Sequence, residues 1–228
     1  MEKEGPMVQK VLCAGLVGLA ASVSNADIAS FGFTDLNGSF DATSMVFTAV
    51  AFTGGEGSTA GDVTRFAEGG GSTANFDSGF FGGGSLANVE IFIEVSNVLG
   101  GMADGAGSFV ITDADGDTIS GDISGTWFAG SMGFVFMNGD TTNVLFSRNS
   151  IGNGNFDGPS GGSFDIDSLV DTYFGALSLL LRTPSGVGFF NADFTEVSTQ
   201  ADGLIVPGPA SLALAGLGGV LVGVRRRR

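Results

Sequence analysis

The chain has 228 residues, of which 40 are glycine, none is histidine, one is cysteine, 24 are acidic and nine are basic. The absence of histidine excludes a His-based catalytic triad and a His-ligated zinc site. The single cysteine excludes a disulfide within the chain and a cysteine metal cluster. A sequence pI of about 4.1 argues against unaided nucleic-acid binding, which needs clustered Lys and Arg.

The acidic residues are concentrated between the two ends of the chain. Residues 27–206 hold 22 of the 24 acidic residues and three basic ones, Arg65, Arg148 and Arg182, for a net charge of −19. Such a segment repels anionic membranes and nucleic acids and attracts cations. Solubility through like-charge repulsion is one interpretation of this charge, and cation binding is the sharper alternative.

The N-terminal segment has the organisation of a secretory signal peptide. An uncharged, largely apolar run covers residues 11–21, and Ser24 and Ala26 supply small residues before a cleavage point at Asp27. We therefore expect this segment to direct the chain to the Sec translocon and to be removed. A start at Met7 instead of Met1 would give a more ordinary positive N-terminal region, so the start codon stays open.

The body of the chain carries the alternating pattern of half-buried β-strands. In the clearest run, 89–95, the four apolar residues fall on one face, and Glu90 and Glu94 fall on the other. Similar apolar runs lie at 31–33, 45–52, 109–112, 134–137, 144–146, 177–181 and 187–190, with turn signals at Asn37-Gly38, Asp115-Gly116, Asn138-Gly139 and Asp157-Gly158-Pro159. The spacing predicts a single all-β domain, a β-sandwich or jelly roll of roughly ten strands.

The aromatic residues are 21 Phe, one Trp and one Tyr. Phe fills a core without a polar atom that needs a partner, whereas sugar-binding surfaces usually depend on exposed Trp and Tyr. We therefore expect Trp127 in the core and not on a sugar-binding platform. The Gly-rich stretches 54–61 and 69–74 are expected to be mobile surface loops.

Asp113, Asp115 and Asp117 stand at alternate positions around Gly116 and could wrap Ca²⁺, which takes six to eight oxygen ligands. The EF-hand pattern then requires Gly and Glu where this chain has Thr118 and Ser124. The favoured interpretation is a hairpin turn at Asp115-Gly116 between strands at 108–112 and 118–124. Weak Ca²⁺ binding by the three aspartates is the alternative.

Paired carboxylates raise the separate question of glycoside hydrolysis. Asp165 and Asp167 fall on one face of a predicted strand, about 7 Å apart, a spacing that a glycosidase could use. Glu90 and Glu94 would be about 13 Å apart and too distant to cooperate. Solvent-facing strand carboxylates are the better account, and no His or positioned Lys activates a hydroxyl. We predict that the chain is not an enzyme and has no cofactor, apart from the Ca²⁺ alternative.

The C-terminus is the most specific feature of the chain. Val206-Pro207-Gly208-Pro209 is followed by fifteen uncharged residues, 210–224, and then by Arg225, Arg226, Arg227 and Arg228. As a helix, 210–224 would span about 22 Å, less than the roughly 30 Å hydrocarbon core, so it would need local thinning of the bilayer. The arginines should stay cytoplasmic, which places the acidic body outside.

This tail resembles the PEP-CTERM sorting signal of bacterial exported proteins, in which a Pro-Glu-Pro motif precedes a transmembrane stretch and a terminal basic cluster. Residues 206–212, the Gly-Leu-Gly-Gly run at 216–219 and the four arginines match that pattern, and Gly208 stands where the family usually has Glu. The resemblance implies recognition and cleavage near the motif by an exosortase, a membrane transpeptidase-like enzyme.

These features predict a signal peptide at 1–26, an acidic Gly-rich β domain at 27–205 and a sorting tail at 206–228. We expect an exported, non-enzymatic surface or extracellular-matrix protein, anchored in the envelope by the tail before processing. The resemblance implies a setting of exopolysaccharide and biofilm, with an exosortase-like enzyme and extracellular polysaccharide as partners and no nucleic acid. The alternative is a Ca²⁺-dependent glycan-binding module at the cell surface.

Overall fold

The computed structural model describes residues 27–54, 57–67, 70–77, 86–169 and 172–208, which belong to one compact unit, Ala26–Gly208. Its strands are β1 (Ile28–Asp41), β2 (Val46–Val50), β3 (Thr53–Gly54), β4 (Gly57–Ser58), β5 (Ala60–Ala67), β6 (Gly70–Asn75), β7 (Asn88–Leu99), β8 (Met102–Thr112), β9 (Thr118–Ala129), β10 (Phe134–Ser147), β11 (Asn155–Asp157), β12 (Ser163–Asp165), β13 (Tyr173–Arg182) and β14 (Phe194–Pro207). A short 3₁₀ helix, η1 (Ser131–Gly133), connects β9 and β10. The prediction of an all-β fold is confirmed.

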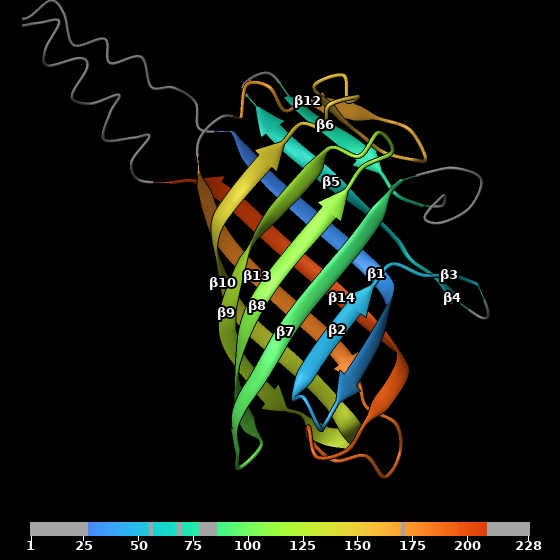
Figure 1. Cartoon of the computed structure of the whole chain (residues 1–228), viewed down its shortest axis with the longest axis vertical. Helices are drawn as coiled ribbons and strands as arrows, with labels where there is room; N and C mark the ends of the chain where they lie inside the picture. The colour runs from blue at the N-terminus through green and yellow to red at the C-terminus, as the bar shows by residue number, and fades with distance from the viewer. Residues whose placement is uncertain (1–26, 55–56, 68–69, 78–85, 170–171, 209–228) are drawn as a thin grey trace, which may run out of the picture. The chain divides into compact units, whose positions relative to one another are not determined.

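Eight strands form a closed antiparallel barrel in the order β1-β2-β7-β8-β9-β10-β13-β14, and β14 pairs back to β1 (Figure 1). The predicted two-sheet sandwich or jelly roll is therefore wrong, because one sheet closes on itself. The cause lies in β1. One edge of β1 pairs with β14 from Ala29 to Phe40, and its other edge pairs with β5 and then with β2. Long, twisted strands paired on both edges close into a barrel, which removes the exposed edges that a sandwich keeps.

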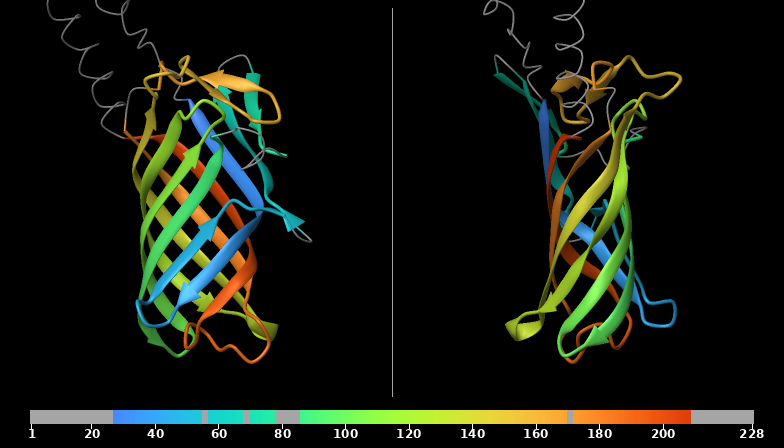
Figure 2. Two further views of the ribbon diagram at one scale, coloured as in Figure 1. Left: turned by 45° about the vertical axis from the view of Figure 1, so that its right-hand side comes forward. Right: turned by 90° about the vertical axis from the view of Figure 1, so that its left-hand side faces the viewer.

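The remaining strands extend the barrel at one end. β5 and β6 continue outward from β1, and the two-stranded β11–β12 sheet lies at the same end, near β6 (Figures 1 and 2). We call this the cap end; the described chain also enters it at Asp27 and leaves it at Gly208. The opposite, hairpin end carries the β7–β8 and β9–β10 turns. The expected loop at 69–74 is wrong, because Gly70–Asn75 pairs with β5 as a regular strand.

Two of the four predicted turns are real and two lie inside strands. Asp115-Gly116 and Asp157-Gly158-Pro159 form turns, but Asn37-Gly38 belongs to β1 and Asn138-Gly139 to β10. At Gly38 an added Cβ would lie 2.3 Å from Thr199 Oγ1 and 2.9 Å from a backbone carbonyl oxygen. This glycine therefore permits close approach of neighbouring strands and not reversal of the chain.

Three of the predicted strand runs differ in the structure. The runs at 134–137 and 144–146 are both part of β10, which is interrupted by a β-bulge where Asn143 has a φ of 52°. The run at 187–190 is not a strand. It lies in the connection between β13 and β14, where Phe190 is buried at the hairpin end.

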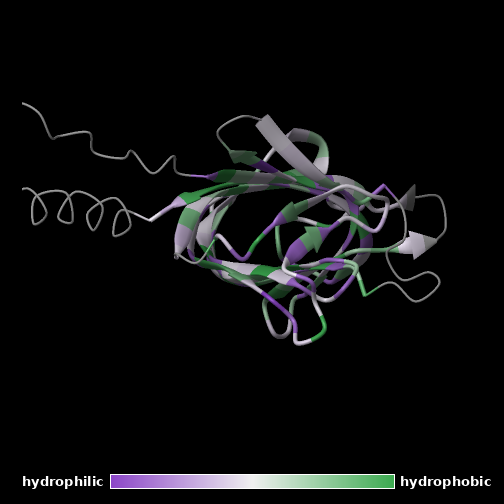
Figure 3. Ribbon diagram, turned by 90° about the horizontal axis from the view of Figure 1, so that it is seen from above, coloured by the Kyte–Doolittle hydropathy of each residue, from purple (hydrophilic) through white to green (hydrophobic). Residues whose placement is uncertain are grey.

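Apolar side chains fill the inside of the barrel, as the alternation along β7 predicts. Val89, Ile91, Ile93 and Val95 are buried, and the glutamates between them are exposed. Figure 3 shows the barrel along its axis, with a flattened outline. The inner volume is occupied by aliphatic and aromatic side chains, so the described interior is a packed core.

Aromatic side chains also close the two ends. At the cap end Phe156 stacks on Phe164 with ring centroids 5.4 Å apart, and Phe76 connects them to Phe33 of β1. At the hairpin end Trp127 meets Phe190 edge-on at 5.1 Å. Trp127 is fully buried, so its predicted place in the core is confirmed.

Candidate functional site

The acidic turn between β8 and β9 is organised by Asp113. One oxygen of this buried carboxylate accepts the backbone N–H groups of Asp115 (2.9 Å) and Asp117 (2.8 Å), and the other accepts the N–H of Asp157 (2.7 Å). Burial raises the pKa of Asp113, against the three N–H groups that lower it, and the Asp117 charge adds to the increase. The hairpin turn is confirmed, and Asp113 links it to β11 of the cap.

Asp117 lies buried beneath the segment that follows β10. Its Oδ1 accepts the backbone N–H of Asn149 at 2.5 Å, and the Asn149 side chain donates to the Asp115 carbonyl at 3.1 Å. Gly152 leaves room for this carboxylate, since a Cβ there would lie 2.0 Å from Asp117 Oδ1. The second oxygen, Oδ2, is buried and has no hydrogen-bond partner among the described residues.

The three aspartates named as calcium ligands do not converge. Both carboxylate oxygens of Asp113 accept hydrogen bonds from backbone N–H groups. Of the two buried carboxylates, only Asp117 has an oxygen, Oδ2, that no described donor binds and that could therefore coordinate a cation. Across the described ranges, no group of three or more His, Cys, Asp or Glu residues is close enough to hold a metal ion. The geometry therefore supports a turn-organising role for Asp113, and a cation would have to recruit backbone or amide oxygens around Asp117.

Asp165 and Asp167 do not form a pair on a strand face. β12 ends at Asp165, and the Asp165 carboxylate accepts the backbone N–H of Asp167 at 2.9 Å. Asp167 instead makes an ion pair with Arg148 at 3.3 Å. The two carboxylates are thus engaged in a local turn and an exposed ion pair.

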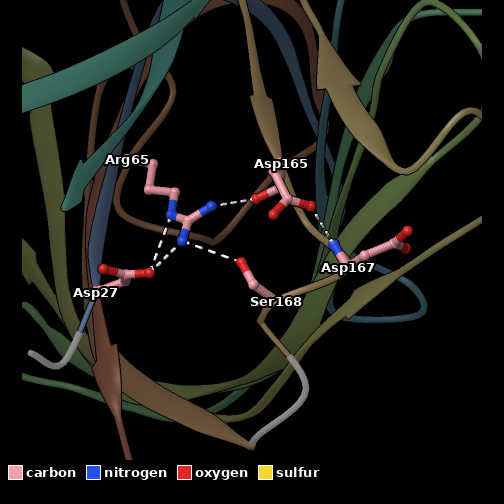
Figure 4. A network of polar contacts seen from close by, with 5 residues as sticks. All are labelled: Asp27, Arg65, Asp165, Asp167 and Ser168. Atoms are coloured by element: carbon pink, nitrogen blue, oxygen red, sulfur yellow. Dashed lines mark hydrogen bonds and ion pairs between the residues drawn. The ribbon is translucent and has the colours of Figure 1, made fainter. Parts of the chain in front are cut away.

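Arg65 forms a polar network that sequence reasoning missed (Figure 4). Its guanidinium binds the Asp27 carboxylate, donates to the Asp165 carbonyl and reaches Ser168 Oγ at 3.0 Å. The network therefore joins the start of the described chain, β5 and the cap. The sequence feature that could have pointed to this network is the scarcity of basic residues: Arg65 is one of three, beside 22 acidic residues, in residues 27–206.

A shallow depression of about 730 Å³ lies on the outer wall of the barrel, across β9, β10, β13 and β14. Three glycines, one alanine and two leucines form part of its lining. The polar lining consists of Ser124, Thr126, Asn138, Asp140, Ser178 and Asp202. The sequence held no local signal for it, since its walls come from four strands that become neighbours only when the sheet forms.

The sorting motif meets the barrel at its last strand. Pro207 ends β14 opposite Tyr173, and the Gly208 N–H donates to the Thr172 carbonyl at 3.1 Å. Pro209, the expected membrane segment 210–224, Arg225–Arg228 and the expected signal peptide 1–26 lie outside the described residues. Within the described ranges, no helix is both long and apolar enough to cross a membrane.

Comparison with known proteins adds no relative: no family model, no curated protein and no solved structure matches this chain.

Proposed function

We propose that the chain is an exported, non-enzymatic protein of the cell surface or extracellular matrix, sorted through its PEP-CTERM-like tail. The single observation that carries the proposal is the order of the C-terminal features: a proline motif, fifteen uncharged residues and four terminal arginines. The positive-inside rule keeps the four arginines cytoplasmic, which leaves the body, at the other end of the fifteen-residue stretch, on the opposite side of the membrane.

The position of the proline motif on the barrel bears on where the sorting tail would be cleaved. Pro207 and Gly208 are held against β13 and Thr172, whereas the motif continues to Pro209 beyond the described barrel. An enzyme that cuts on the C-terminal side of Gly208 would leave the β13–β14 pairing intact. We therefore expect the mature chain to end close to Gly208.

Fractionation of producing cells tests the proposal. The full chain should reach the envelope or matrix, and mass analysis should place its mature C-terminus near Gly208. A variant with all four terminal arginines changed to Gln should lose this destination or its processing, whereas Arg182→Gln, which removes one positive charge from the barrel, should not. Delivery of a chain that lacks 209–228 to the same place, or cytosolic retention of the intact chain, would refute the proposal.

A second candidate is the Ca²⁺-dependent glycan-binding module, and the unpaired, buried Asp117 Oδ2 favours it. A buried carboxylate oxygen without a donor is costly, and a bound cation would relieve that cost. Calcium should then raise the thermal unfolding midpoint with concentration in the intact chain and not in Asp117→Asn. An equal midpoint with millimolar Ca²⁺ and with a chelator removes this candidate.

A further inference from the structure

We propose that the depression on the outer wall binds a neutral, hydroxyl-rich polysaccharide. This inference rests on the proposed surface or matrix function and names the chemistry of the partner. It concerns a different region from the acidic turn at the cap end and does not require calcium.

A row of glycines beneath the depression explains why the wall is hollow there. Gly105, Gly125 and Gly139 are direct neighbours across β8, β9 and β10, and Gly203 lies further along the same row in β14. A Cβ on Gly203 would lie 2.2 Å from the Phe31 ring, and one on Gly125 would lie 2.4 Å from the Asn138 carbonyl oxygen. Without side chains at these positions, the wall can lie close against the core.

The outward residues on either side of this glycine row present hydrogen-bonding groups. Thr126, Asn138, Ser178 and Asp202 are direct neighbours on four successive strands. In this row the Asp202 carboxylate accepts a hydrogen bond from Gln200 at 2.9 Å. In the row beyond the glycines, Asp140 lies between Ser124 and Ala176, and no described side chain or backbone N–H donates to its carboxylate. The carboxylates therefore have free acceptor positions, and the amide and hydroxyls can both donate and accept.

An apolar strip borders the polar rows. Phe128 and Phe136 face each other across β9 and β10, with ring centroids 5.2 Å apart and planes at 19°, and Leu180 continues the strip on β13. Phe136 is 37 % exposed and Leu180 is 41 % exposed. A sugar ring has apolar C–H faces and hydroxyls at its edge, which fits an apolar strip beside hydrogen-bonding rows. Because Phe stands where sugar-binding surfaces usually have Trp or Tyr, we expect the depression to bind each sugar ring weakly.

The same features argue against other polymers. The four strands that carry the depression are hydrogen-bonded on both sides, so a peptide cannot add to them as a further strand. Two carboxylates within the depression and a net charge of −19 on residues 27–206 repel anionic polymers. A ligand with many neutral hydroxyl donors satisfies these constraints.

Native affinity electrophoresis of the full-length protein tests the inference. Gels contain dextran or hydroxyethyl cellulose as neutral probes, alginate as an anionic probe, or no polysaccharide. At least one neutral probe should retard the protein, with and without a chelator, and alginate should not. Asp140→Ala and Phe136→Ala should each weaken the apparent affinity about tenfold. Glu94→Ala and Phe92→Ala, which change outward residues of β7, are the matched controls and should leave it unchanged.

The fluorescence of Trp127 checks that each variant is folded, and Ser178→Ala replaces any variant that is not. Three results would overturn the inference: retardation by neither neutral probe, retardation by alginate, or an equal loss of affinity in the depression variants and in the control variants. If the protein reaches the surface but binds neither neutral probe, the proposed function stands and this inference fails. If the protein binds a neutral probe but stays in the cytosol, the inference about the depression stands and the proposed function fails.

Discussion

Replacing Asp113 by Ala should destabilise the barrel strongly, because this carboxylate accepts three backbone N–H groups from two different segments. Leaving a buried donor unsatisfied costs about 1–3 kcal/mol. Asp117 is fully buried, whereas Asp115 and Asp157 are partly exposed and can recover some hydration. Removing a buried charge also returns part of its desolvation cost. We therefore expect a loss of about 3–5 kcal/mol in the free energy of unfolding.

Two variants make this prediction specific. Asp113→Asn keeps one acceptor oxygen, which can serve the Asp115 and Asp117 N–H groups, and should cost about 1–2 kcal/mol through the lost Asp157 bond. Asp115→Ala changes a carboxylate in the same turn that accepts no hydrogen bond from a described residue, and should stay within about 0.5 kcal/mol of the parent. Urea unfolding followed by the fluorescence of Trp127, the single tryptophan, measures all three. Equal losses for Asp113→Ala and Asp115→Ala would show that the carboxylate does not hold the turn to the cap.

The remaining predictions concern the termini, the wall and pH. Arg65→Gln breaks a largely buried ion pair with Asp27 and should cost about 1–3 kcal/mol in urea unfolding, whereas exposed Arg182→Gln should cost less than about 0.5. Gly203→Ala should lower stability by about 1–3 kcal/mol because its Cβ would meet the Phe31 ring, whereas Gly71→Ala, with ordinary contacts, should be nearly neutral. Burial raises the folded-state pKa of Asp113, so protonation of its carboxyl adds stability that is complete below the ordinary value of 3.8 and is lost as pH rises through the folded value. This increment is separate from the hydrogen bonds that the carboxylate accepts. The parent should therefore gain more stability on acidification than Asp113→Asn, and equal pH profiles would contradict this assignment.

The sequence pattern predicted what depends on neighbouring residues. Alternation along 89–95 places the apolar residues of β7 inside, and Asp115-Gly116 forms the expected hairpin turn. The 21 Phe residues, which have no polar side-chain atom that needs a partner, predicted a core rich in aromatic rings, and Trp127 lies in that core. Each of these features follows from side chains a few positions apart, where the period of two decides which face is buried.

Features that depend on distant pairing were not predictable in this way. Closure depends on β1 and β14, which join Ala29 to Ile205, and a sandwich would use the same strand pattern. Glycines were the main source of error. Gly38 and Gly139 resemble turn signals but allow close contacts within strands, and the Gly-rich segment 69–74 is mostly β6. The Arg65 network and the outer depression are likewise assembled only when segments distant in the sequence come together.

The packed interior determines where recognition can take place on this domain. Phe and Trp rings close both ends, and aliphatic side chains fill the space between them, so a ligand would have to displace core residues to enter. The outer wall can vary without that cost, since its residues alternate with the core residues along each strand. The inward glycines shape this wall, and the outward hydroxyl, amide and carboxylate groups give it its chemistry. The alternation of inward and outward residues along the strands therefore specifies a stable barrel and, independently, the chemistry of its outer surface.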